Sequence, residues 1–255
     1  MNSRKSESVD RSNVGVVLVA KNTQEIDYLR IAELAAKLIT KNLQLPVTII
    51  EPTDNQVNQK LTESTPQEWR NFGRWQVYDQ SPYDTTILLD SDYLTLTPLL
   101  TQLHSTIHDY RVLRTNNTPT GKMNSPMGKF ANRHLWATMV MFQKTAKTQL
   151  LFEMVERVER NRRYYQQLFK LPHGSFRNDF AFTIADLVIN GYQLEQSSLP
   201  ITALTITDPI KSIKRINRLI NIKTDRHNIV IPEQDLHIMD KRYLLTTEFE
   251  EFVNE

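Results

Sequence analysis

The sequence predicts an α/β fold, with a mixed, mainly parallel sheet flanked by helices and a C-terminal extension. Two observations predict it, and the composition and length of the chain allow it. Strand-like apolar runs alternate with helix-like periods over the first hundred residues, and the connections between them are short. The hydrophobic share of 40% is ordinary for a globular protein, and 255 residues are enough for one good core.

The first elements are a buried strand and an amphipathic helix. Val14–Ala20 is a continuous apolar, β-branched run, as expected of a strand that is buried on both faces. A helical period follows, because apolar residues recur three or four positions apart between Ile26 and Leu43. Pro46 prevents further helix, and Val47–Ile50 gives a second short strand.

The third strand ends in an acidic residue. Residues 53–64 are polar and indicate a loop, and Thr65–Glu68 has the pattern of a capping box, which predicts a helix running to about Ser81. Thr85–Leu89 is the next apolar strand and leads directly into Asp90. Because ligands in parallel α/β sheets bind beyond the carboxyl ends of the strands, Asp90 lies where a ligand is expected.

The second half of the chain is less regular. Trp136–Phe142 predicts a strand and Thr148–Phe169 a long helix. Asp179–Asn190 predicts a shorter helix, which Gly191 would end in the left-handed conformation. The remaining candidate strands are short: Ala203–Thr207, Ile229–Ile231 and Leu236–Met239.

Composition excludes several kinds of chemistry. The chain has no cysteine, which excludes disulfides, cysteine-ligated zinc and thiol catalysis. The net charge of +2 is small, so attraction to nucleic acid would need a local patch. No apolar run is long enough to span a bilayer, and neither a phosphate-binding P-loop nor a Gly-X-Gly-X-X-Gly motif is present. Met1–Ser12 is polar and charged rather than a secretory signal, so we expect a cytoplasmic protein.

Asp90 and Asp92, with Ser91 between them, form a candidate metal site. Both carboxylates can turn toward one hard cation, and oxygen ligands suit Mg²⁺ or Mn²⁺, which can bridge the phosphates of a nucleotide diphosphate. The cation's Lewis acidity would stabilise charge on a leaving diphosphate. The alternative is a polar turn after a strand, where aspartate and serine are common.

The stretch Tyr83–Leu94 resembles the metal-binding strand of GT-A glycosyltransferases, especially the glycogenin and galactosyltransferase group, with a Tyr-Asp pair, a hydrophobic strand and Asp-X-Asp. Trp69–Tyr78 is placed like that group's preceding helix, and Trp136–Phe142 is similar to its strand beside the acceptor site. The resemblance implies transfer of a sugar from a nucleotide-sugar donor, with a UDP-sugar first among candidates and Mn²⁺ or Mg²⁺ as cofactor. The sequence shows no internal repeat and no clean linker, so we expect a leader (1–12), one catalytic domain (13–209) and a basic C-terminal segment (210–255) that completes the same domain.

The resemblance also assigns further site residues. Asp179 matches an acidic residue near the sugar and acceptor, where it would accept hydrogen bonds or act as a general base. The alternative, which can coexist with this role, is capping of a helix by Asn178 or Asp179. His237 is similar to a late histidine that completes the metal shell, and an imidazole ligand would favour Mn²⁺. Lys241 would then reach the diphosphate, but the chain lacks a Gly-Leu-Lys-Pro-type ending after the histidine. The remaining donor-binding candidates are Ala20, Lys21, Asn22, Glu51, Arg74, Asp90 and Ser91.

Two basic segments bear on the acceptor. Residues 210–226 combine an apolar stripe with lysines and arginines, and residues 157–170 combine basic residues with two tyrosines. Such segments suit DNA phosphates or an anionic membrane surface, and a solvated helix face covering the core explains them as well.

The string Arg177–Phe182 resembles small GT-A proteins of tailed bacteriophages, some of which glycosylate hydroxymethylated pyrimidines in phage DNA. That resemblance implies double-stranded DNA as a partner, a location in the host cytoplasm, and an extruded base held by Tyr164 or Trp136. The alternatives are a glycan or lipid-linked sugar as acceptor, a nucleotidyltransferase, or an inactive sugar-nucleotide-binding module. The sequence leaves open the oligomeric state, the donor sugar and whether the anomeric configuration is retained.

Overall fold

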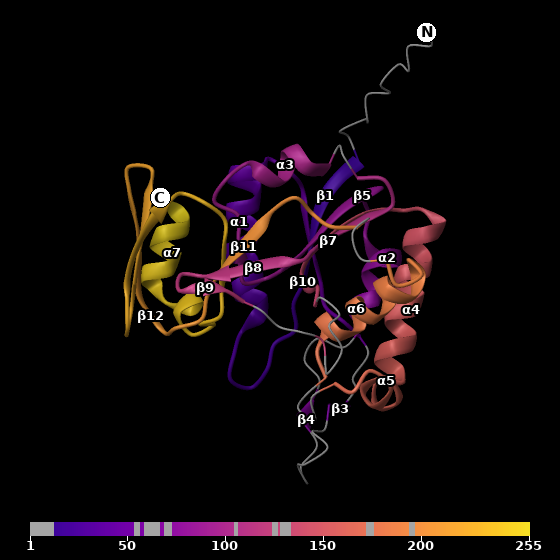
Figure 1. Ribbon diagram of the computed structural model, residues 1–255. Helices are drawn as coiled ribbons and strands as arrows, with labels where there is room; N and C mark the ends of the chain where they lie inside the picture. The colour runs from indigo at the N-terminus through magenta and orange to yellow at the C-terminus, as the bar shows by residue number, and fades with distance from the viewer. Residues whose placement is uncertain are drawn as a thin grey trace.

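The computed structural model describes residues 13–53, 57–58, 67–68, 73–104, 107–123, 127, 134–171, 176–193 and 197–255. A five-stranded sheet with the strand order β2-β1-β5-β10-β7 lies at its centre (Figure 1). The strands are β1 (Val14–Val19), β2 (Val47–Ile50), β5 (Thr85–Asp90), β7 (Tyr110–Leu113) and β10 (Trp136–Gln143). β1 pairs in parallel with β2 and β5, whereas β10 is antiparallel to both β5 and β7. Four strands therefore run in one direction, which confirms the predicted mixed, mainly parallel sheet.

Helices cover both faces of this sheet, which explains the continuous apolar strands. Side chains of β1 alternate between the two faces: Val16 and Leu18 pack in the cluster that contains the apolar side of α1 (Tyr28–Leu43), whereas Val17 packs with α4 (Ala146–Arg160) and α6 (Asn178–Ile189). Each face of a strand thus meets apolar side chains, as in other sheets flanked by helices. The predicted first helix and the helix before Gly191 are confirmed, and Gly191 has a positive φ of 59°.

A second five-stranded sheet has the order β6-β15-β11-β8-β9. Its strands are β6 (Tyr93–Leu94), β8 (Thr115–Thr118), β9 (Gly121–Lys122), β11 (Thr202–Ile206) and β15 (Leu236–Ile238). β15 pairs antiparallel with β6, directly after the Asp-X-Asp segment, and the predicted late strands are confirmed. This pairing joins the end of the third predicted strand to a segment near the C-terminus.

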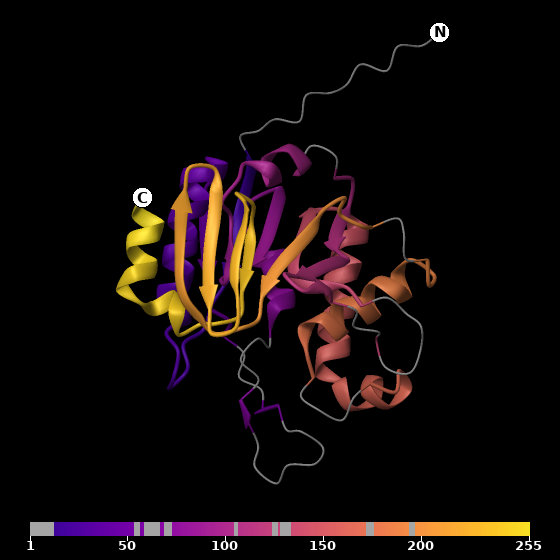
Figure 2. The ribbon, with the colours of Figure 1, turned by 60° about the vertical axis from the view of Figure 1, so that its left-hand side comes forward.

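A third sheet contains β12 (Ile210–Ile216), β13 (Leu219–Thr224) and β14 (Asn228–Pro232), all antiparallel. α7 (Thr247–Asn254) packs against one face of it, and Figure 2 shows the three strands side by side. Residues 210–226 therefore form a β-hairpin and not a helix face. A register shift between Ile210 and Ser212 turns both Ile210 and Ile213 inward, which mimics helical spacing in the sequence.

The helix predicted from Thr65 is largely wrong within the described residues. β3 (Val57–Asn58) and β4 (Gln67–Glu68) form a short antiparallel pair, so the helix does not start at residues 67–68. Of the described residues in this stretch, only the 3₁₀ turn η2 (Arg74–Gln76) and α2 (Val77–Gln80) are helical, and they follow Gly73 at a φ of 92°. The rest of the proposed helix start, Trp69 and most of the proposed loop lie outside the described residues, as does the leader 1–12.

The predicted long helix is broken into α4 and α5 (Arg162–Leu168). Asn161 at the joint has a φ of −110°, and its side-chain amide donates to the carbonyl of Arg157 at 2.8 Å, a local bond that competes with helix continuation. The shorter elements are α3 (Leu99–Leu103) and η4 (Tyr243–Leu245). Among the described helices, none is long and apolar enough to cross a membrane.

Candidate active site

A cavity of about 1020 Å³ opens beyond the carboxyl ends of β1 and β5, where the sequence predicted ligand binding. Its walls come from separate parts of the chain: Ala20 and Lys21 after β1, the segment Asp90–Asp92, His237 on β15 and Asp179 in α6. A cavity of this size suits a ligand as large as a nucleotide sugar. The structure thus brings most of the sequence-predicted site residues to one place.

Asp90, Asp92 and His237 form the candidate metal centre, since one ligand atom from each lies within 4.8 Å of the others. The pairing of β15 with β6 causes this convergence, because the Ile238 amide donates to the Asp92 carbonyl at 2.9 Å. His237 Nε2 then lies 3.3 Å from Asp92 Oδ1. Asp92 and His237 are buried, whereas the side chain of Asp90 is 28% exposed.

The second ring nitrogen of His237 is held by β11. His237 Nδ1 lies 3.1 Å from Thr205 Oγ1, and the Thr205 hydroxyl donates to Asn116 Oδ1 at 2.8 Å. Because that hydroxyl proton is directed to Asn116, the Thr205 oxygen is left to accept from Nδ1–H of the imidazole. Such a bond orients the ring and leaves Nε2 as the nitrogen that could bind a metal ion.

Lys241 pairs with one member of the acidic pair, Asp92. Its ammonium forms an ion pair with Asp92 Oδ2 and donates to the Ile238 carbonyl at 3.1 Å. Burial raises the pKa of Asp92, but the positive charges of His237 and Lys241 outweigh this and hold that pKa below its ordinary value. Burial lowers the pKa of His237, whereas the negative charge of Asp92 raises it. The second effect wins, so the net shift of the pKa is upward. His237 and Lys241 therefore balance the negative charge of Asp92.

Arg74 approaches the other carboxylate, Asp90, from η2. Its Nη1 donates to Asp90 Oδ1 at 2.5 Å, and the residue is only 4% exposed. The other two guanidinium nitrogens, Nε and Nη2, are buried without a hydrogen-bond partner among the described residues. Arg74 lines the cavity, and a 3₁₀ turn rather than the predicted long helix positions it. Unpaired buried donors are costly, so a nearby anionic ligand would satisfy them.

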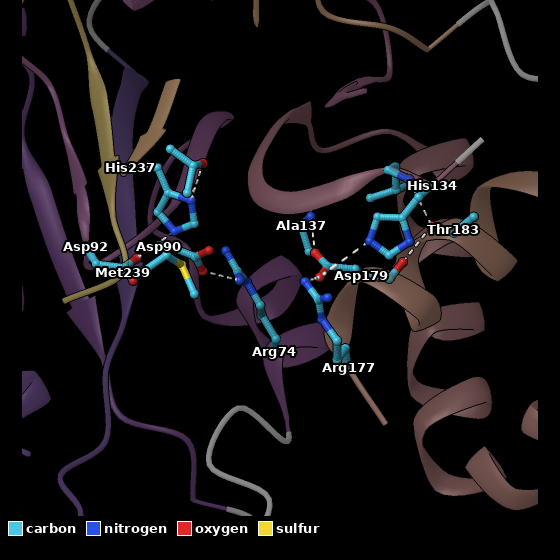
Figure 3. A network of polar contacts seen from close by, with 12 residues as sticks. Arg74, Asp90, Asp92, His134, Ala137, Arg177, Asp179, Thr183, His237 and Met239 are labelled. Atoms are coloured by element: carbon cyan, nitrogen blue, oxygen red, sulfur yellow. Dashed lines mark hydrogen bonds and ion pairs between the residues drawn. The ribbon is translucent and has the colours of Figure 1, made fainter. Parts of the chain in front are cut away.

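Asp179 lies across the cavity from the metal centre, near the start of α6 (Figure 3). Its Oδ1 accepts from the Ala137 amide at 2.8 Å, and its Oδ2 forms an ion pair with Arg177. His134 Nε2 lies 3.5 Å from the same Oδ2. Burial raises the pKa of Asp179, but His134, Arg177 and the Ala137 amide lower it to about 2. A carboxylate held in this way is a weak base, which favours its hydrogen-bonding role over the general-base role.

The predicted capping role of this segment is wrong. Arg177 is the N-cap of α6, and it makes no side-chain capping bond. Asp179 points instead toward β10, because its carboxylate accepts from the Ala137 amide.

His134 is a site residue that the sequence analysis missed. Its ring packs edge-on against Trp136 at 5.1 Å and Phe180 at 5.6 Å. Trp136 lines the cavity, and the Arg177 guanidinium lies 5.8 Å from the centre of its ring. No local pattern marks His134, because its partners lie in β10 and α6.

Two predicted donor-binding residues do not line the cavity. The Asn22 side-chain oxygen accepts from the Leu29 amide at 2.8 Å, so this residue supports the start of α1. Glu51 is exposed after β2. Ser91 is buried and lines the cavity. Tyr164, on α5, is 61% exposed and is not among the described residues that line the cavity. The same holds for every residue of 210–226.

Comparisons with known proteins found only remote structural similarity. No protein-family model and no curated protein matches the chain. A glycosyltransferase GlyE from Streptococcus pneumoniae TIGR4 matches at 18% identity over 61% of this chain and 43% of that chain, with a TM-score of 0.34. Its apo form matches at 17% identity over 74% of this chain and 45% of that chain, with a TM-score of 0.37.

A glycosyltransferase involved in glycosylation of the major capsid of PBCV-1 matches at 14% identity over 60% of this chain and 69% of that chain, with a TM-score of 0.35. The chain spans less than half the length of the two GlyE chains. These neighbours are glycosyltransferases, but with TM-scores below 0.5 the function has to be argued from the site.

Proposed function

We propose that this protein is a metal-dependent glycosyltransferase that moves a sugar from a nucleotide-sugar donor to an acceptor hydroxyl. One observation carries the proposal: Asp90, Asp92 and His237 present ligand atoms within 4.8 Å of one another. They do so on the wall of a cavity that also contains a buried arginine and, opposite, a carboxylate. A polar turn after β5 would not need a histidine from a distant strand beside it.

The donor atoms fit a divalent cation. Two carboxylates and one imidazole nitrogen suit Mn²⁺ better than Mg²⁺, which prefers oxygen ligands. When bound, the cation would supply Lewis-acid stabilisation of the departing diphosphate. Thr205 orients the imidazole of His237, and Lys241 holds Asp92 in place when no other cation does.

The chain's own residues would bind the rest of the donor. Arg74 offers two buried N–H donors without partners among the described residues, and phosphate oxygens match a guanidinium well. Lys241 brings a second positive charge to the same wall. Ala20 and Lys21, at the end of β1, lie where the nucleoside of the donor, proposed as uridine, would bind.

Asp179 would bind the acceptor or the transferred sugar. Its charged carboxylate can accept a hydrogen bond from a sugar hydroxyl while Arg177 and the Ala137 amide hold it in place. Trp136 offers an aromatic surface beside it. This arrangement suits a hydroxymethylated pyrimidine of DNA, stacked on Trp136, as the acceptor to test first. A glycan or a lipid-linked sugar is the second acceptor class to test.

The test is a titration of UDP into the protein with and without Mn²⁺, followed by tryptophan fluorescence or calorimetry. We expect Mn²⁺ to tighten UDP binding at least tenfold, and Asp92→Asn to abolish that tightening, since the variant loses a charged ligand. Asp79→Asn, an exposed residue of α2, is the matched control and should behave like the wild type. UDP binding that is indifferent to both Mn²⁺ and Asp92→Asn would refute the proposal.

Release of UDP from UDP-sugars in the presence of hydroxymethylated DNA, or of glycan acceptors, would then identify the acceptor. A nucleotidyltransferase would instead release pyrophosphate from a nucleoside triphosphate. A module without activity would bind UDP and release neither product.

A further inference from the structure

The sheet β12–β14 has one covered face and one open face. Figure 1 shows α7 on the side of this sheet that faces the rest of the molecule. Ile213, Ile220 and Ile222 point to that side and belong to a core cluster that includes Phe249 and Phe252 of α7. Because side chains alternate along a strand, the residues between them point to the open side.

The open face carries a row of exposed apolar residues. Ile216 pairs with Leu219, and Leu219 pairs with Pro232, so these three side chains lie next to one another across the sheet. Ile216 is 51% exposed, Leu219 42% and Val230 55%, and Pro232 is also exposed. Single exposed apolar residues are common, but four neighbours on one sheet face form a patch of the kind that mediates binding.

Positive charge surrounds this apolar row. Lys214 and Lys223 point to the same face, and Arg218 lies in the turn between Ile216 and Leu219. All three are exposed, and none of them forms an ion pair with another residue of the described chain. The outward positions of the three strands contain no acidic residue: they are Ser212, Lys214, Ile216, Leu219, Asn221, Lys223, Asn228, Val230 and Pro232.

We propose that this open face, the outward side chains of β12–β14 together with Arg218, docks on an anionic lipid surface. Apolar side chains at the centre can enter the boundary between headgroups and acyl chains, while the lysines and the arginine contact lipid phosphates. A nucleic acid would use the cations but would leave the apolar row in water. A lipid surface therefore matches both features of the face, and the proposal does not depend on the catalytic function proposed above.

The test is co-sedimentation of the full chain with vesicles of phosphatidylcholine alone or mixed with phosphatidylserine. We expect binding only to the phosphatidylserine vesicles. The double variant Lys214→Ala/Lys223→Ala should reduce partitioning roughly 25-fold, at about fivefold for each positive charge near the surface. The variant Leu219→Ser/Val230→Ser should reduce partitioning about tenfold or more, because two exposed apolar side chains are lost.

Matched controls come from elsewhere on the surface. Lys37→Ala/Lys41→Ala removes two exposed lysines from α1, and Leu150→Ser removes a leucine of α4 that is 51% exposed. Neither control should change partitioning. All of these positions are exposed, so the variants are expected to fold, which circular dichroism would verify.

Three results would overturn the proposal. The first is a wild-type protein that does not sediment with phosphatidylserine vesicles. The second is retention on DNA that depends on the two lysines but not on Leu219 and Val230, which would assign the face to nucleic acid. The third is self-association in sedimentation velocity that Leu219→Ser/Val230→Ser abolishes, which would make the face an interface between copies of the chain.

Discussion

Glu159 provides a sharp prediction about pH and stability. Its side chain is fully buried in α4, where Oε2 accepts from the Gly73 amide at 3.2 Å and Oε1 has no hydrogen-bond partner among the described residues. Burial raises its pKa to about 8, although Gly73, Arg74 and Arg160 oppose the shift. The folded protein therefore keeps the proton of Glu159 at pH values where the unfolded chain has lost it.

The sign of the effect follows from this difference. An unfolded glutamate titrates near 4.5, so between that pH and about 8 the folded state binds more protons than the unfolded state. The free energy of unfolding should then fall as the pH rises through this window. At about 1.4 kcal/mol for each unit of pKa difference, the full loss is on the order of 5 kcal/mol, complete above about pH 8.

The perturbation is Glu159→Gln, which keeps an oxygen for the Gly73 amide but cannot ionise. We expect urea unfolding to give the variant and the wild type similar free energies near pH 5. Near pH 8 we expect the variant to be more stable by several kcal/mol. Glu153→Gln, on the same helix but exposed, should leave the pH dependence unchanged.

A variant that is less stable than the wild type at every pH would refute this reasoning. It would mean that Glu159 is charged in the fold and acts as a partner of Arg74, whose guanidinium lies near it. Loss of that charge would then weaken the support of Arg74 beside Asp90, and UDP binding would weaken as well.

The remaining predictions concern other buried carboxylates and the metal centre. Asp186 is fully buried and accepts hydrogen bonds from Tyr110, Ser197 and Arg114. Asp186→Asn should therefore lower the free energy of unfolding in urea by about 3 kcal/mol. An unchanged urea midpoint would contradict the role of this network. Lys241→Met should strengthen binding of Mn²⁺ alone roughly tenfold in a titration, because the ammonium no longer competes for Asp92; weaker binding would show that Lys241 supports the site. Asp179→Asn should lower turnover on the order of 100-fold while UDP affinity stays the same, since Asp179 lies across the cavity from the metal centre; a loss of UDP affinity would place Asp179 on the donor side.

The central sheet could be predicted because its strands carry their own signal. Val14–Ala20 and Thr85–Leu89 are buried on both faces, and that burial requires continuous apolar runs. The position of Asp90 at a strand end followed from the same pattern, as did the cavity next to it. The participation of His237 was expected only from family resemblance, because the pairing of β15 with β6 leaves no local signature.

Other elements could not be predicted from periodicity. Ile210, Ile213 and Ile220 have helix-like spacing, but a register shift in β12 produces it, and Ile216 lies on the open face. The break at Asn161 depends on one side-chain hydrogen bond within an otherwise helical pattern. His134 was missed since its role rests on contacts with Asp179 and Trp136, which come together only in the fold.

The most direct test of the central claim is pulsed electron paramagnetic resonance of Mn²⁺ bound with UDP. If His237 Nε2 completes the centre with Asp90 and Asp92, the wild-type spectrum should show coupling to an imidazole nitrogen, and His237→Gln should remove it. Coupling that survives in His237→Gln, or a wild-type spectrum without nitrogen coupling, would contradict the account.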